Sequence, residues 1–319
     1  MANPQYGQLI ATAFENVVTS KPIEQIFEEF WLFNHLTKKN GGLVTLDGGR
    51  NIEFTLSYAA NPTFRSITQN ETLDTSSTDF IDAATYEWKF HAGTVRWDEA
   101  ELFKASGESA KYDLLAAKVS NAVNSHKEDL STALVAATSG NNVSGLQTLI
   151  PDTNTSGSPG GISKSTYSWW RSTSQAGTQT STAFDNLRSS YRTAYNGAST
   201  GYSGKHPTVM VSGLAPFAGY EQILVANERI TEKKEGDAGF KNAALKYKGA
   251  TYGYDERIGA RCYFLNPDGI KLAVGKGHWM KMGKDIESIN SLSYVRKFHS
   301  FLQMCVVEPR LLAVVHTIS

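Results

Sequence analysis

The segment YAANPTFRSITQNETLDTSSTDF, residues 58–80, decides how the first half of the chain is interpreted. It is polar, rich in Thr, Ser and Asn, and lies between two segments that alternate apolar and polar side chains. Loops longer than about 12–15 residues with no secondary structure of their own are uncommon in compact domains and usually serve a function. We therefore expect residues 58–80 to have a role of their own.

The flanking segments predict two β-strands. In NIEFTLSY, residues 51–58, every second side chain is apolar, which is typical of a strand with one buried face. TYEWKFHAGTVRWD, residues 85–98, alternates in the same way but changes phase at Gly93, which predicts a bulge or bend there. Joined through residues 58–80, the two strands are expected to form a long two-stranded finger.

Two segments predict helices in the first half. Residues 22–39, PIEQIFEEFWLFNHLTKK, carry apolar residues at helical spacing around more than half of the circumference. Such a helix needs burial on more than one side, either in the core or between subunits. Residues 108–140 predict a helix of about 30 residues, roughly 45 Å long, ending at Gly140. His126 lies on its apolar stripe and is expected to be a packed residue rather than a ligand.

The second half mixes helices and strands without regular alternation. After an irregular region at 140–181, helices are predicted at 183–195 and 217–230 around a buried strand at 207–213. From Leu245 onward the chain reads mostly as strands. This order indicates an α+β fold rather than a doubly wound sheet.

Composition narrows the function classes. The 319 residues include 31 Lys and Arg and 31 Asp and Glu, so the formal charge of zero does not support a strongly basic nucleic-acid binder. A balanced charge leaves little self-repulsion and suits a protein that packs against copies of itself. Cys262 and Cys305 are too few for a disulfide framework or a four-thiolate zinc site, and we expect both to be buried.

No apolar run reaches the roughly 18 residues that a membrane span needs, and the N-terminus lacks the pattern of a secretory signal. We therefore expect a reducing, cytosol-like setting and no membrane.

The sequence contains none of three common catalytic motifs. A phosphate-binding loop fails because Gly204-Lys205 is followed by His206, and neither a Gly-x-Ser-x-Gly elbow nor a His-Glu-x-x-His helix occurs. The seven histidines show no metal-ligand spacing. We expect no enzymatic activity, no cofactor and no bound metal.

An ordered series of segments carries a resemblance. It runs GGISKSTYSWWRS (160–172), YEQIL (220–224), DAGFKNAALKYKGATYGYDE (237–256), ARCYFLNPDGIKL (260–272) and QMCVVEPRLLAVV (303–315). The series resembles the major capsid proteins of tailed bacteriophages, which have the Hong Kong 97-like coat fold shared by encapsulins. It covers about residues 140–319, and the first half matches by the order of its elements.

The resemblance implies a division of the chain. It predicts an N-terminal arm and first helix at 1–44, an extended hairpin loop at 45–98, and the spine helix of a peripheral domain at 99–140. An axial domain would follow at 141–290, and strands at 291–319 would return to the peripheral and axial sheets. Residues 58–80 would then be the loop tip, lying over a neighbouring subunit. The inter-subunit candidates are Phe27, Phe30, Trp31, Phe64, Arg65, Glu71 and Asp74.

One departure from the family concerns covalent cross-linking. Some members cross-link through a lysine in the extended loop, but residues 51–88 contain no Lys and only one Arg, Arg65. Loop contacts are therefore expected to be non-covalent, and Arg65 is a candidate to pair with acidic groups of a neighbour.

The function implied by the resemblance is structural. Copies would form hexamers and pentamers that close into an icosahedral shell around phage double-stranded DNA, assembled in the host cytoplasm and found in the virion. A separate scaffolding protein, a portal and possible decoration proteins are the expected partners, and DNA contacts would be non-specific. The candidates to face DNA are Lys111, Lys118 and Arg188.

Two alternatives stay open. One is an encapsulin-type compartment of the same fold, holding protein cargo. The other is a hydrolase with an unrecognised site, which turnover by a purified monomer would reveal.

Overall fold

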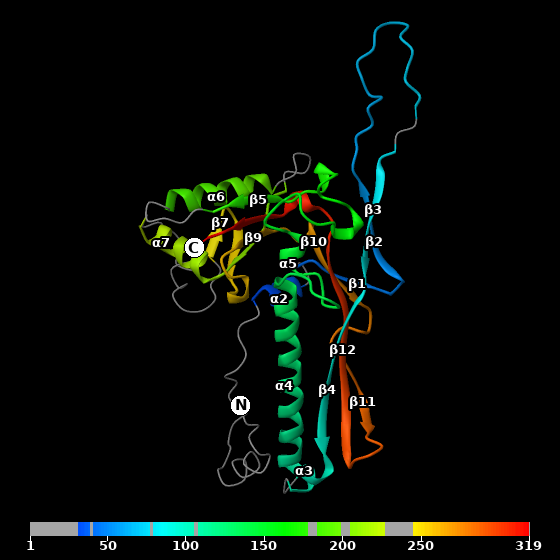
Figure 1. Cartoon of the computed structure of the whole chain (residues 1–319), viewed down its shortest axis with the longest axis vertical. Coiled ribbons are helices and arrows are strands. Elements are labelled where there is room, and N and C mark those ends of the chain that lie inside the picture. The colour runs from blue at the N-terminus through cyan, green and yellow to red at the C-terminus, as the bar shows by residue number, and fades with distance from the viewer. Residues whose placement is uncertain are drawn as a thin grey trace.

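The computed structural model describes residues 31–38, 41–76, 79–104, 108–177, 184–198, 205–226 and 245–318. It has two sheets and one long helix, with a hairpin loop that projects far beyond the rest of the chain (Figure 1). The mixture of helices and strands confirms the predicted α+β class.

The long sheet is built around one central strand, β12, to which three others pair antiparallel. The parallel strand β1 adds to β10 at the edge. The members are β1 (Leu43–Leu46), β10 (Ile270–Gly275), β12 (Ser293–Val306), β11 (Lys281–Glu287) and β4 (Lys89–Asp98).

Helix α4 (Glu108–Val135) lies along one face of this sheet, and α3 (Glu99–Lys104) precedes it (Figure 1). His126, Leu130 and Leu134 of the predicted stripe are buried, so the helical prediction is confirmed. The helix ends at Val135 rather than at Gly140. The chain turns back so tightly that a Cβ at Gly145 would lie 1.9 Å from the Ala136 carbonyl oxygen, which only glycine permits.

The six-stranded sheet forms a second layer, packed against helices α6 (Phe184–Gly197) and α7 (Leu214–Ala226). Its order is β5 (Thr173–Ala176), β13 (Ala313–His316), β9 (Cys262–Leu265), β6 (Val209–Ser212), β8 (Ala250–Tyr254) and β7 (Leu245–Tyr247). Edge-to-face aromatic pairs fill the space between helices and sheet, with Tyr191 5.6 Å from Phe264 and 6.3 Å from Tyr252 between ring centroids. Cys262 and Cys305 are both buried, as expected.

The remaining elements are short. They are α2 (Trp31–Leu36), α5 (Leu146–Leu149), and the 3-10 turns η1 (Pro159–Gly161), η2 (Ser168–Trp170), η3 (Glu256–Ile258) and η4 (Pro309–Leu311). No helix in the described residues is both long enough and apolar enough to span a membrane.

The predicted finger is shorter than expected. Strand β2 (Asn51–Ser57) pairs with β3 (Ile81–Glu87) in the expected hairpin, but the chain leaves it after Glu87 and enters the long sheet as β4. The predicted bulge at Gly93 is wrong, because β4 pairs with β12 without interruption, including Gly93 with Phe298. The phase change arises because β4 carries apolar side chains on both of its faces: Phe90 is exposed, whereas Val95 and Trp97 are buried on the opposite face.

The two sheets do not follow the expected ranges. Strands β10 and β11, inside the expected axial range 141–290, pair within the long sheet, while β12 and β13, from the expected range 291–319, pair within the long sheet and the six-stranded sheet respectively. The chain passes from β9 to β10 through a tight turn, in which the backbone N–H of Gly269 donates to Asn266. Sequence patterns locate such strands but do not give their partners. We propose that the boundary between the peripheral and axial domains is set by the two sheets, so that each strand belongs to the domain whose sheet it joins.

Candidate assembly surfaces

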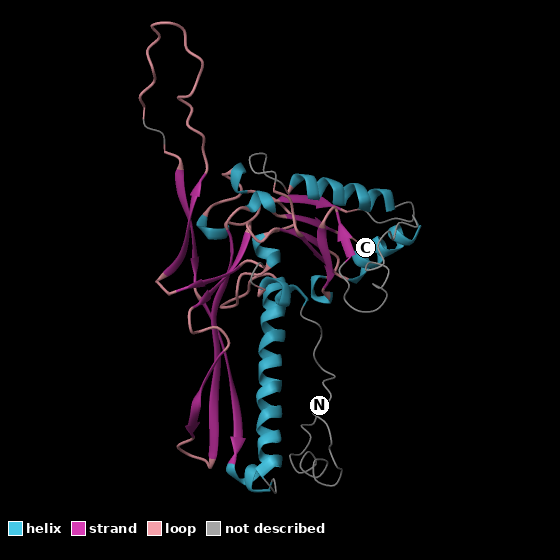
Figure 2. Cartoon of the chain, turned by 180° about the vertical axis from the view of Figure 1, so that it is seen from behind, coloured by secondary structure: helices cyan, strands magenta, loops and turns pink. Residues whose placement is uncertain are grey.

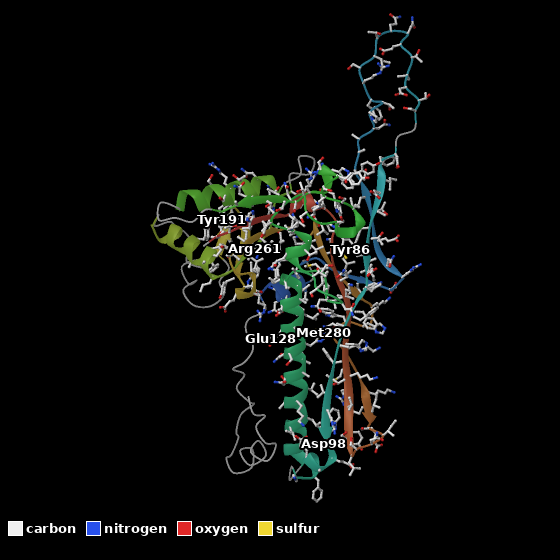
Figure 3. All side chains as sticks on the ribbon, viewed as in Figure 1. Tyr86, Asp98, Glu128, Tyr191, Arg261 and Met280 are labelled. Carbon is white, nitrogen blue, oxygen red and sulfur yellow. The ribbon has the colours of Figure 1, made fainter. Side chains whose placement is uncertain are left out.

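The base of the projecting loop is fixed to the body by aromatic stacking. The Tyr58 ring stacks on Trp169 with centroids 5.1 Å apart, and the Tyr58 backbone N–H donates to Phe80 at 3.1 Å. The neighbouring Trp170 is buried and donates from its indole N–H to the Pro159 carbonyl at 2.9 Å. Below it, Tyr86 joins β3 to the long sheet by accepting from the Val306 N–H and donating to the Val306 carbonyl (Figure 3).

The loop tip forms an ion pair and several hydrogen bonds within itself. Arg65 pairs with Glu71 at 2.6 Å and donates to the Thr72 carbonyl, so the predicted inter-subunit cation is engaged within its own loop. Asp74 accepts from the Ser76 backbone N–H at 2.9 Å, and this hydrogen bond lowers the pKa of Asp74. The tip therefore has local turn structure although it lies away from the body (Figure 2).

The tip leaves its apolar side chains exposed. Phe64, a predicted contact residue, is 86% exposed, and Leu73 and Ile67 are 62% and 51% exposed. Exposed apolar groups in one segment mark an interaction site more often than a scattered surface residue does. Ile67 and Leu73 were not among the predicted contact residues, although their isolation in a polar segment was a usable signal.

The start of the described chain packs on its own subunit. The Trp31 ring lies so close to β8 that a Cβ at Gly253 would be 2.0 Å from it. Burial raises the pKa of Asp255, while Arg257 and the Leu32 backbone N–H oppose that rise. Trp31 thus anchors α2 within the chain, and Phe27 and Phe30 lie outside the described residues.

We expect Gly253→Ala to lower the free energy of unfolding by about 1–3 kcal/mol, because the added methyl group displaces Trp31. Urea denaturation measures this change. Gly93→Ala is the matched control, since its Cβ would meet nothing within 4 Å and the change should stay below about 0.5 kcal/mol. Equal stability of Gly253→Ala and the parent would show that Trp31 does not pack on β8.

Of the predicted DNA-facing cations, the structure describes only the side chain of Lys118. Lys118 pairs with Glu101 at 2.5 Å, which joins α4 to α3. The side chains of Lys111 and Arg188 lie outside the described residues.

His126 is a packed residue, as predicted. Its Nε2 lies 2.8 Å from the Ser300 Oγ, which also accepts the Met280 backbone N–H at 3.0 Å. Burial, with further effects of His91 and His299, lowers the pKa of His126 to about 4. Within the described ranges, no three His, Cys, Asp or Glu side chains are grouped so as to hold a metal ion.

The chain was compared with known proteins. No family model matches it, and no curated protein matches its sequence. Solved structures do match over nearly the whole chain. The cyanophage A-1(L) capsid subunit is 16% identical with a TM-score of 0.64, covering 97% of this chain and 99% of that one.

Two further structures agree. The capsid of the Myoviridae phage XM1 is 12% identical with a TM-score of 0.60 and covers 95% of this chain and 96% of that one. The SrpI encapsulin of Synechococcus elongatus is 10% identical with a TM-score of 0.61, and the match covers 98% of this chain and 95% of that one. The long sheet beside helix α4, the separate six-stranded sheet and the projecting hairpin together have the Hong Kong 97-like fold of tailed-phage capsid proteins.

Proposed function

We propose that this protein is the major capsid protein of a tailed bacteriophage, assembling into a closed icosahedral shell of hexamers and pentamers. The observation that carries the proposal is the projecting loop, whose exposed Phe64, Ile67 and Leu73 lie on a tip held away from its own body. Exposure of these apolar side chains to water is energetically unfavourable, and their burial against a neighbouring copy would remove that cost.

Assembly would rest on many modest contacts rather than on one strong contact. The Arg65–Glu71 pair and the Asp74 turn would hold the tip in shape before it meets a neighbour, which reduces the entropy lost on docking. Each contact is then repeated around the shell, so that weak interfaces sum to a stable particle. Phe64 is the contact residue of the predicted set that this arrangement favours most.

The shell would enclose double-stranded DNA, with a portal and a separate scaffolding protein as assembly partners. The balanced charge of the chain favours dispersed contacts with DNA over one basic surface. Lys111, Lys118 and Arg188 stay candidates, with Lys118 the weakest because Glu101 neutralises it. We assign the chain no catalytic role.

An encapsulin-type compartment is the second candidate, since an encapsulin is among the similar structures. Both functions predict closed shells, and they differ in the contents. A phage capsid encloses nuclease-protected double-stranded DNA when its packaging partners are present, whereas a compartment encloses one co-purified protein.

The decisive experiment is electron microscopy of the full chain, expressed alone and together with its neighbouring genes. We expect closed shells of uniform diameter. A protein that stays monomeric in both conditions would contradict the proposal, and shells filled with a single protein species would favour the compartment.

A further inference from the structure

A cluster of cations and aromatic rings occupies the face of the long sheet opposite α4. Strand register places Phe90 beside Phe301, Ala92 beside His299 and Thr94 beside Lys297 on β4 and β12. On the other side of β12, Lys281 lies beside His299. We call the surface formed by Phe90, His278, Lys281, Lys297, His299 and Phe301 the lysine–histidine face.

The aromatic part of this face is preassembled. The His278 ring stacks on Phe301 with centroids 4.6 Å apart, and Phe90 meets Phe301 edge-on at 4.8 Å. Phe90 is nevertheless 66% exposed. A large aromatic group left open on a rigid sheet is suited to receive an apolar side chain.

The charged part is uncompensated. Lys281 and Lys297 are exposed, and in the part of the chain that the structure describes neither has a carboxylate partner. Burial lowers the pKa of His299, and His278 and Lys281 lower it further. On β4, the Asp98 carboxylate is paired with Arg96 at 3.3 Å.

The projecting loop has the complementary properties. Residues 58–82 contain four carboxylates, Glu71, Asp74, Asp79 and Asp82, against one cation, Arg65, which gives a formal charge of −3. The same segment carries the exposed apolar groups of the tip. The loop extends away from the β4, β11 and β12 end of its own subunit (Figure 1), so only the loop of another copy can reach this face.

We propose that the lysine–histidine face receives the acidic loop of a neighbouring copy, and that protonation of its histidine pair strengthens the contact. The inference rests on the proposed function, because it assigns a receptor to the loop of a shell protein. Apolar tip residues would pack on Phe90 and Phe301 while the loop carboxylates approach Lys281 and Lys297. Packaged DNA is the competing occupant, but a phosphate backbone leaves the apolar tip and the exposed Phe90 without partners.

The histidine pair supplies the pH dependence. His278 Nδ1 lies 3.2 Å from His299 Nε2, so in the neutral pair one ring donates and the other accepts. One added proton keeps this hydrogen bond, because an imidazolium still donates through it.

Several charged or titratable groups surround the histidine pair and can influence its protonation. On the same face these are Lys281 of β11, Lys297 of β12 and the Arg96–Asp98 ion pair of β4. The Lys276–Asp47 ion pair and, across the sheet, His126 complete the set. A docked carboxylate offsets the repulsion from Lys281 and raises the pKa of His299 from its lowered value, so docking takes up a proton and strengthens as the pH falls.

Charge reversal tests the receptor. Lys281→Glu/Lys297→Glu should reduce the yield of closed particles at least about tenfold, since like charges would then face each other. Adding Asp79→Lys/Asp82→Lys in the same chain, at two loop carboxylates outside the Asp74 turn, should restore particles by exchanging the two signs. Lys127→Glu/Arg310→Glu, which reverses two cations outside this face, should keep the parental yield.

The outcomes separate the two proposals. Parental particle yield from Lys281→Glu/Lys297→Glu, or no recovery in the fourfold exchange although circular dichroism shows it folded, would overturn the receptor assignment and leave the shell function intact. Loss of packaged DNA with normal shells would instead assign the face to nucleic acid. Absence of shells from the parent chain would overturn the shell function itself.

The pH dependence is tested on the same particles. The critical concentration for assembly, followed by light scattering, should fall about threefold between pH 7.5 and 6.0 for the parent chain. His278→Gln/His299→Gln should flatten this dependence, whereas His206→Gln should not. An equally steep dependence in the double glutamine variant would overturn the role given to the histidine pair.

Discussion

Deleting residues 60–79 will leave a folded subunit and abolish closed shells. The hydrogen bonds and the ion pair described for residues 61–76 stay within that segment, and neither hydrophobic core cluster contains a residue from it. The deletion should therefore change the free energy of unfolding by less than about 1 kcal/mol, while the number of particles should fall by about two orders of magnitude. Urea denaturation and electron microscopy measure the two effects.

A narrower variant separates loop length from loop chemistry. Phe64→Ser/Ile67→Ser/Leu73→Ser keeps the tip turns but removes its apolar groups, and it should also fail to form shells. Thr63→Ser/Thr72→Ser is the matched control and should assemble normally. Normal shells from the deletion would show that the loop is dispensable, and unfolding of the deleted chain would show that the loop belongs to the core.

Acid will destabilise the subunit through His126. Its pKa is about 4 in the folded chain, against about 6.5 for an ordinary histidine. Because the unfolded state binds the proton first, stability is unaffected above pH 6.5 and falls as pH drops from 6.5 to 4, by about 3 kcal/mol in total. Below pH 4 this residue adds no further loss. Urea denaturation of the unassembled subunit across this range measures the slope.

His126→Gln should reduce that slope, because glutamine still reaches Ser300 but does not titrate. It should cost about 1–2 kcal/mol at pH 7.5 through poorer packing. His206→Gln, at an exposed position, should keep the parental slope. An unchanged slope in His126→Gln would mean that His126 is accessible to protons in the folded state.

Periodicity predicted the parts of the fold that depend on local physics. The apolar stripe of α4 and the alternation of β2 each follow from one buried face, and both elements form where expected. Pairing partners depend on residues far apart in sequence, and so the β4–β12 ladder was not predictable. The change of phase near Gly93 predicts a bulge, whereas β4 is continuous and has apolar side chains on both faces, with Phe90 exposed and Val95 and Trp97 buried.

The candidate contact residues show the same limit. Phe64 is a predicted contact residue and is exposed, but the pairing of Arg65 with Glu71 depends on the turn geometry at the tip, which the sequence pattern does not give. The lysine–histidine face gathers residues from β4, β11, β12 and the β10–β11 connection, which are up to about 210 positions apart. Such a surface exists only after the strands have paired in their final register, so no local sequence pattern predicts it.

The order of strands has a consequence for synthesis on the ribosome. The central strand of the long sheet, β12, begins at Ser293, and β13, which joins β5 to β9 in the other sheet, begins at Ala313. Neither layer can close until β12 and β13 have been synthesised, although the projecting hairpin is translated early. A copy that terminates before Ser293 therefore lacks a middle strand in both layers and cannot fold into a subunit.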